Sequence, residues 1–269
     1  LTVSNTQADG RTISGAGGVT INALAAGAVL TNLTASGTVT ANVAADTNYT
    51  ANSTLGAVDA YVVASGAVAT LTSAQATGLA ISGAGGLTVT GLAADANLGS
   101  VSAAGTVTAN VATSLDYSSN ANLAVVDTFV IADSVTGSFS AAQGANTITL
   151  GSGSVAKVIV ASEDISGTSL SASVTAIDVS DNGTAILSAA QAQLTVALGA
   201  SAVAKMSVST TTDVSSSTLD SDVSEFVVSA GILTVSNTQA DGRKITGSGT
   251  LTVKAIAADA NLSDVSNSC

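Results

Sequence analysis

The sequence of 269 residues contains no proline, no histidine and no tryptophan, and it has a single cysteine and a single methionine. Without histidine, the chain has no Ser-His-Asp or Cys-His catalytic apparatus. One cysteine excludes a disulfide framework and a metal centre built from cysteine and histidine. We therefore expect no catalytic residues, no bound metal and no cofactor.

Charge is also scarce. Charged residues make up 9% of the sequence, and six basic against eighteen acidic side chains give a formal net charge of −12. An acidic excess repels nucleic acid and anionic lipid, so we expect neither as a partner. Although the mean hydropathy is +0.53, polar residues interrupt every apolar run within a few positions. We predict no membrane span and no signal peptide.

A repeat runs through the whole chain. Residues 1–11, LTVSNTQADGR, recur unchanged at residues 233–243, and weaker copies lie between them. Each copy contains a marker glutamine, and the intervals between successive markers are 68, 68, 48 and 48. An apolar residue also stands 13 or 14 positions before each of the last four markers. We predict that these nine residues define the repeat structurally: Gln7, Gln75, Gln143, Gln191, Gln239, Tyr61, Phe129, Ile177 and Phe226.

The two unequal repeat lengths, 68 and 48, distinguish between architectures. Deleting about 20 residues from a β-sandwich removes about two strands, whereas a solenoid can lose one coil while its neighbours restack. Short alternating runs such as TVTANV and KVIVA indicate strands, and proline is excluded from strands that are paired on both sides. The sequence therefore predicts an all-β fold, a parallel β-solenoid of about 11–12 coils. Tandem β-sandwich repeats are the alternative.

The repeat also predicts the domain organisation. We expect residues 1–269 to form a single continuous repeat array. Residues 233–269 repeat the phase of residues 1–37, and neither end shows the charged or proline-bearing cap that protects isolated solenoids from edge pairing. We therefore expect a fragment of a longer array, or a subunit in a longer assembly.

Four charged residues recur at repeat spacing. Asp59 and Asp127 stand beside the aromatic strands, and we interpret them as solvated surface carboxylates, because the shorter repeats lack them. Lys157 and Lys205 are separated by the length of the shorter repeat, and we interpret them as stacked surface lysines that discourage lateral strand pairing.

Two further features have competing interpretations. Thr38 and Thr40, like Thr106 and Thr108, have the spacing found on flat ice-binding faces, but they lie in the coil that the shorter repeats lack. Ice binding therefore stays a secondary hypothesis. Cys269 is either an intermolecular disulfide partner or an incidental terminal residue.

The motifs ISGAGGLTVT at residues 81–90, LAADANL at 92–98 and SGTVTAN at 36–42 are the basis of a resemblance. This combination resembles the β-strand repeats of very large bacterial surface and secreted proteins, namely giant adhesins, exoproteins and surface-layer-associated proteins. The resemblance covers essentially the whole chain and implies an extracellular, non-enzymatic spacer or scaffold at the bacterial cell surface. It gives no calcium site, because no GGxGxDxxx series is present.

From the resemblance we expect a structural or adhesive protein that forms a stiff rod, layer, filament or stalk. Its expected partners are other copies of itself, end to end or side by side, or a cell-surface polysaccharide. The alternative is a glycan- or ice-binding module that uses one flat face of the solenoid.

Overall fold

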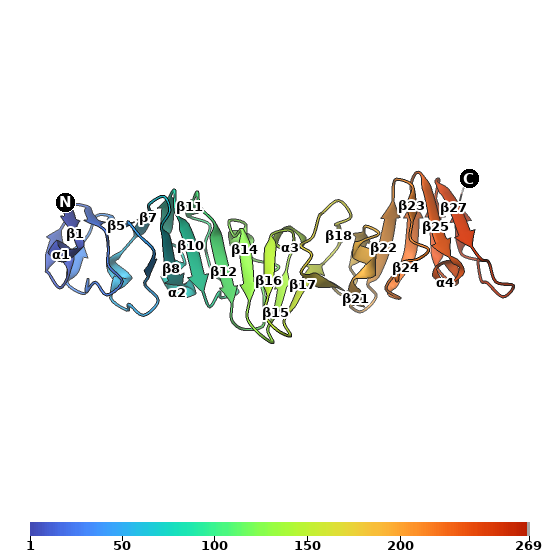
Figure 1. Ribbon diagram of the computed structural model, residues 1–269, viewed down its shortest axis with the longest axis horizontal. Coiled ribbons are helices and arrows are strands. Elements are labelled where there is room, and N and C mark those ends of the chain that lie inside the picture. The colour runs from blue at the N-terminus through green and yellow to red at the C-terminus, as the bar shows by residue number, and fades with distance from the viewer. Residues whose placement is uncertain (268–269) are drawn as a thin grey trace. The chain divides into compact units, whose positions relative to one another are not determined.

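The structure is a computed structural model, and it describes residues 1–267. The chain is all-β, and its short parallel strands stack coil on coil into a β-solenoid of about 14 turns (Figure 1). The predicted fold class is therefore confirmed, and parallel coil stacking does not fit the sandwich alternative.

The register between strands gives the length of a coil. Val19 pairs with Val39 of the next coil, and Val39 in turn bonds to Asp59, which stands 20 residues further along the chain. One coil therefore takes about this length. The solenoid has about 14 coils and not the 11–12 that we expected, because each coil is shorter.

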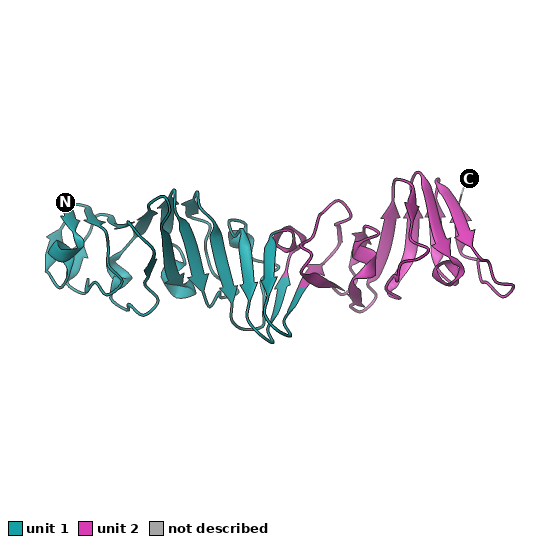
Figure 2. Cartoon of the chain, viewed as in Figure 1, with its two compact units in different colours: residues 1–138, 146–156 teal, residues 139–145, 157–269 magenta. Residues whose placement is uncertain are grey.

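The chain divides into two compact units (Figure 2). Unit 1 comprises Leu1–Ser138 and Asn146–Ala156, and unit 2 comprises Phe139–Ala145 and Lys157–Cys269. None of these boundaries falls at a marker glutamine, so the division does not follow the sequence repeats.

Unit 1 contains two six-stranded parallel sheets and two short strand pairs. The first sheet has the order β1 (Thr2–Ser4), β3 (Val19–Asn22), β5 (Val39–Val43), β7 (Ala60–Val63), β9 (Ala80–Gly83) and β11 (Val101–Ala103). The second sheet has the order β6 (Thr47–Asn48), β8 (Val68–Thr72), β10 (Gly86–Thr90), β12 (Val107–Val111), β14 (Thr128–Ile131) and β16 (Thr147–Leu150). The short pairs are β2 (Ile13–Gly15) with β4 (Leu33–Ala35) and β13 (Leu115–Asp116) with β15 (Thr136–Phe139), and the last residue of β15, Phe139, belongs to unit 2.

Unit 2 is built in the same way. Its six-stranded sheet has the order β18 (Glu163–Asp164), β20 (Thr184–Leu187), β22 (Val203–Val208), β24 (Val223–Val228), β26 (Lys244–Gly247) and β28 (Val265–Asn267). A second sheet has the order β23 (Thr212–Asp213), β25 (Ile232–Ser236) and β27 (Thr250–Lys254), and β19 (Val174–Val179) pairs with β21 (Thr195–Leu198). The strand β17 (Val155–Val160) runs across the boundary between the units.

Within residues 1–267, helices occur only as single turns at the corners of coils. The α-helical turns are α1 (Asn5–Ala8), α2 (Ser73–Ala76), α3 (Ala141–Gly144) and α4 (Asn237–Ala240). The 3-10 turns are η1 (Leu55–Ala57), η2 (Ala121–Leu123) and η3 (Gln191–Gln193). Such short helices are not stable alone, and they form here because neighbouring coils pack against them.

The core follows from the two-residue period of the strands. In β5, Val39, Ala41 and Val43 are buried, whereas Thr40 and Asn42 between them are half-exposed. Successive side chains of a strand point to opposite faces, so each coil sends every second residue inward. Burial of a valine or leucine contributes about 1.5–3 kcal/mol, and stacked coils repeat this gain at each level.

Equivalent strands of successive repeats belong to different sheets. In unit 1, β1 precedes Gln7 and lies in the first sheet, whereas β8 precedes Gln75 and lies in the second sheet. In unit 2, β20 and β25 precede Gln191 and Gln239 and likewise lie in different sheets. The repeat lengths of 68 and 48 residues differ by 20, which is one coil. Neither length is a whole number of coils, and both leave the same remainder. A repeat therefore advances the motif partway around the coil, so the long and short repeats are not three and two whole coils.

Candidate functional site

Each marker glutamine holds the start of a single helical turn. Gln7, Gln75, Gln143 and Gln239 are the third residues of α1 to α4, and each side chain accepts a hydrogen bond from the N-cap backbone N–H at 2.8–2.9 Å. The N-cap Ser or Thr oxygen accepts a bond from the glutamine backbone N–H in return, which completes a capping box. Gln191 forms the same reciprocal pair with Ser188, although the turn there is a 3-10 turn.

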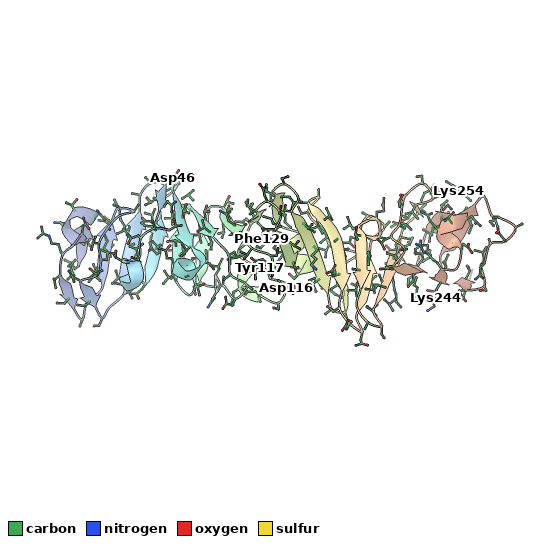
Figure 3. The ribbon with its side chains drawn as sticks, turned by 90° about the horizontal axis from the view of Figure 1, so that it is seen from below. Asp46, Asp116, Tyr117, Phe129, Lys244 and Lys254 are labelled. Atoms are coloured by element: carbon green, nitrogen blue, oxygen red, sulfur yellow. The ribbon has the colours of Figure 1, made fainter. Side chains whose placement is uncertain are left out.

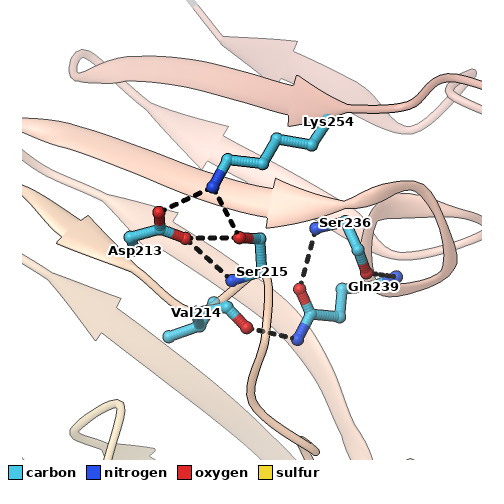
Figure 4. A network of polar contacts seen from close by, with 6 residues as sticks. All are labelled: Asp213, Val214, Ser215, Ser236, Gln239 and Lys254. Carbon is cyan, nitrogen blue, oxygen red and sulfur yellow. Dashed lines mark hydrogen bonds and ion pairs between the residues drawn. The ribbon is translucent and has the colours of Figure 1, made fainter.

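The other end of the glutamine side chain reaches the preceding coil. Gln75 Nε2 donates to the carbonyl oxygens of Tyr49 and Asn52, both at 2.9 Å. Gln239 Nε2 donates to the carbonyl oxygen of Val214 (Figure 4) and to that of Ser217, both at 2.7 Å. A carboxamide has one acceptor and two donor hydrogens, and here it satisfies three backbone groups on two coils. Gln191 makes the same two bonds, to the carbonyl oxygens of Ile165 and Thr168.

The four apolar residues before the markers all lie in the core. Tyr61, Phe129, Ile177 and Phe226 are at most 1% exposed and lie on β7, β14, β19 and β24. The register places the rings beside smaller side chains, as where Tyr61 pairs with Ala41 in one neighbouring coil and Ile81 in the other. Alternation of large and small residues lets a narrow interior accept an aromatic ring. All four are therefore core residues, and the Phe226 ring also lies under the Arg243 guanidinium, at 5.2 Å from its centroid.

Two buried tyrosines, Tyr49 and Tyr117, were not predicted as structural residues from the sequence. The Tyr49 hydroxyl donates to the carbonyl oxygen of Leu24 at 2.8 Å, and the Tyr117 hydroxyl donates to that of Leu92 at 3.0 Å. Tyr117 lies inside the coil, close to Phe129 in projection (Figure 3). Burial raises the pKa of both phenols, that of Tyr117 to about 12. Their recurrence in NYTAN and DYSSN, at the spacing of the longer repeat, was the signal that would have found them.

The recurring aspartates are not simply solvated. Although exposed, Asp59 and Asp127 accept hydrogen bonds from the backbone N–H groups of Val39 and Val107 in the preceding coil, each at 2.8 Å. Asp46 (Figure 3) accepts a hydrogen bond from the N–H of Val68, which lies in the following coil. The predicted surface position of Asp59 and Asp127 is confirmed, and the structure adds a backbone hydrogen bond to each. They satisfy N–H groups at strand starts, which lack a ladder partner.

The lysines form ion pairs between coils, and Lys157 and Lys205 do not stack on each other. Lys157, Lys205 and Lys244 each bond to a neighbouring coil, whereas Lys254 reaches past β25 to β23. Lys157 pairs with Asp178, and Lys254 pairs with Asp213 at 2.8 Å (Figure 4). Lys205 and Lys244 flank Glu225 at 3.0 and 3.2 Å. The Glu225 side chain is 10% exposed, and its burial raises the pKa, but hydrogen bonds from the two lysines outweigh burial and leave the pKa below its ordinary value.

Threonines line the outer face of the second sheet of unit 1. Registers between neighbouring strands align one threonine from each of five consecutive coils: Thr70, Thr88, Thr108, Thr128 and Thr147. These side chains are half-exposed or exposed, and the six strands of the sheet contain no charged residue. Of the four threonines considered for ice binding, only Thr108 belongs to this ladder. The ladder repeats at the coil spacing, which a comparison of whole repeats does not show.

Three other predictions concern a metal site, a membrane span and Cys269. Within residues 1–267, no group of three or more His, Cys, Asp or Glu residues is placed to hold a metal ion. Among the same residues, no helix has the length and apolar character needed to span a membrane. Cys269 lies outside the described residues, so the predicted disulfide stays a prediction.

Comparison with known proteins adds no relative. The chain matches no family model, no curated protein and no solved structure. The functional conclusion therefore depends on the chain's own residues.

Proposed function

We propose that the protein is a non-enzymatic, extracellular structural or adhesive repeat protein of the bacterial cell surface. Its stacked coils would form a stiff part of a stalk, layer or filament. Its partners would be other copies of the chain or a cell-surface polysaccharide.

The observation that carries this proposal is the use of polar side chains to join coils. Gln75 bonds to the coil of Tyr49, the Tyr49 hydroxyl bonds to the coil of Leu24, and Asn52 Nδ2 donates to the carbonyl oxygens of Ala26 and Ala28. These bonds add to the backbone ladder between the same coils. Extension of such a stack must break many hydrogen bonds together, which suits a load-bearing element.

Two sequence features support the extracellular assignment. The motifs at residues 36–42, 81–90 and 92–98 resemble repeats of large surface and secreted proteins. The acidic excess keeps β-rich chains apart in solution. Both features suit a long exported array.

Two measurements test the proposal. Surface labelling and protease accessibility of the epitope-tagged chain in intact bacterial cells should place it outside the cell. Single-molecule pulling should give unfolding forces above those of a helical protein of equal length. Retention of the chain in the cytoplasm, or unfolding at the force of the helical reference, would contradict the proposal.

The threonine ladder favours a second function, namely binding of ice or glycan by a flat face. Hydroxyl and methyl groups repeat along the ladder at the strand spacing, about 4.8 Å. Thermal hysteresis and a glycan array test the two ligands with the wild-type chain and with Thr108→Lys. Absence of both activities in the wild type would remove this candidate, and activity that Thr108→Lys leaves unchanged would remove the ladder as its site.

A further inference from the structure

An open groove lies beside Gln75 in unit 1. Its volume is about 360 Å³, and it lies between α2 and the coil that precedes it. The residues that define it are Asn52, Leu55, Val58, Tyr61, Gln75 and Leu79. No charged side chain lines the groove, and its walls include Leu55 of η1 and Gln75 of α2.

A filled counterpart of this groove lies beside Gln239 in unit 2. Leu79 stands four residues after Gln75, and Arg243 stands four residues after Gln239. The preceding coils also correspond, because the N–H of Val58 bonds to Leu55 just as the N–H of Val223 bonds to Asp220. By the same offset, Tyr61 of β7 corresponds to Phe226 of β24. Each of these residues of the first groove therefore has a counterpart at the same position in unit 2.

The Arg243 side chain occupies the second groove. Its guanidinium carbon lies 5.2 Å from the centroid of the Phe226 ring, which is cation–π geometry. Nη2 donates to the carbonyl oxygen of Asp220 at 3.1 Å, and Nη1 lies 3.5 Å from that of Gln239. Burial lowers the pKa of Arg243, although a guanidinium stays charged in proteins. The repeat thus builds a place for a partly buried planar cation.

We propose that the groove beside Gln75 is a binding site for a guanidinium group supplied by a ligand. Leu79 is shorter than arginine and lacks its charge, so the groove keeps a ring and carbonyl acceptors without the cation. The carbonyl of Leu55 accepts one bond from Val58, and a carbonyl oxygen has two lone pairs.

The charge around the groove suits a cation. Unit 1 contains seven aspartates, and Arg11 is its one basic side chain. An acidic unit attracts cations to its surface, and a neutral groove within it presents no competing lysine. A guanidinium fits better than an ammonium, because it is planar, more weakly hydrated and able to stack on a ring.

The Leu79 side chain should weaken binding of a guanidinium in the wild-type groove. Tyr61 is 1% exposed, so contact between a ligand and its ring requires the flexible Leu79 side chain to turn aside. For the wild type we expect a dissociation constant on the order of 1 mM for a single guanidinium contact. Leu79→Ala should bind several-fold more tightly, and Leu79→Arg should bind no ligand because its own side chain fills the groove.

Titration of the full chain with N-acetylarginine amide tests the site. Amide NMR signals of Gly56, Ala74 and Thr77, which line the groove, should shift and saturate. N-acetyllysine amide is the chemical control and should bind at least several-fold more weakly. Arg243→Leu opens the Phe226 groove and should create a second site, whereas Leu79→Ala tests the first groove even if Arg243→Leu fails to fold.

The chain also contains an internal control. A groove of about 420 Å³ lies beside Gln191, but no aromatic residue lines it, and Ile177 stands where Tyr61 stands in unit 1. Signals of Gly167 and Leu194 in that groove should not move with the arginine probe. Equal shifts at both grooves, or binding that Leu79→Arg leaves intact, would overturn the proposal.

The guanidinium can come from a small molecule or from Arg11 of a second copy, which is exposed. Sedimentation of the wild type, Arg11→Gln and Leu79→Arg distinguishes these sources. If both variants weaken self-association, the ligand is Arg11 of a second copy. If neither does while the arginine probe still saturates, the ligand is a small molecule. No saturable binding of the probe by wild type or Leu79→Ala would overturn the proposal for both sources.

Discussion

In unit 1 the one basic side chain is Arg11, whereas unit 2 contains Arg243 and all four lysines of the chain. Both units use marker glutamines to bond one coil to the next. Unit 2 adds ion pairs between coils, as where Lys205 and Lys244 flank Glu225. The comparison shows that a backbone ladder, an aliphatic core and side-chain amides are enough to stack coils, and that ion pairs are an addition to this common design.

The largest expected effect concerns the core that both units share. Phe129→Ala in unit 1 and Phe226→Ala in unit 2 each remove a fully buried ring, and we expect each to lower the free energy of unfolding by about 3–5 kcal/mol. All three tyrosines lie in unit 1, so tyrosine fluorescence in urea reports on that unit, and hydrogen exchange by mass spectrometry reports on both. A loss under about 1 kcal/mol in one unit would show that its core is not packed as described.

The next effect tests the side-chain amide that both units use. Gln75→Ala and Gln239→Ala each leave an N-cap N–H and two carbonyl groups without their partner. We expect a loss of about 1–3 kcal/mol in each unit, measured by urea unfolding. Gln193→Ala is the matched control, because the exposed Gln193 side chain bonds only to Ala189 and should cost less than about 0.5 kcal/mol. Equal effects at Gln193 and Gln239 would contradict the role of the markers.

Acid should destabilise unit 2 more than unit 1, because the buried ion pairs of Glu225 lie in unit 2. The pKa of Glu225 is below its ordinary value, so its stabilising contribution is complete above the unfolded pKa and is lost as pH falls through the folded pKa. Lys254 and Ser215 similarly lower the pKa of Asp213 to about 2. We expect the opening free energies of β22, β24 and β26, obtained from hydrogen exchange after correction for the intrinsic exchange rate, to fall as pH falls from about 5 towards 2.

The control for this prediction is Glu225→Gln, which removes the titrating group while keeping the side chain's size. The opening free energies of these three strands should depend less on pH in the variant than in the wild type. An unchanged pH dependence in Glu225→Gln would show that the ion pairs with Lys205 and Lys244 do not distinguish unit 2.

The sequence predicted the fold class because its signals are local and periodic. Alternating strands, absent proline and two unequal repeat lengths all indicate a solenoid. The coil length was missed because neither interval between markers is a whole number of coils. The same mismatch concealed the ladder from Thr70 to Thr147, whose members come from different parts of the repeat. Roles such as that of Asp59 depend on which N–H lies opposite, and only the register between coils determines that.

The smallest expected effect concerns the most exposed ion pair. The side chains of Lys254 and Asp213 are 54% and 53% exposed, so water and salt screen their attraction. Lys254→Met should therefore leave the urea midpoint of unit 2 unchanged at neutral pH, whereas Lys205→Met should lower it, because Glu225 then keeps only Lys244. Added salt should reduce the difference between Lys205→Met and the wild type. Equal midpoints for the two variants would mean that burial of Glu225 contributes nothing to the ion pairs that set unit 2 apart from unit 1.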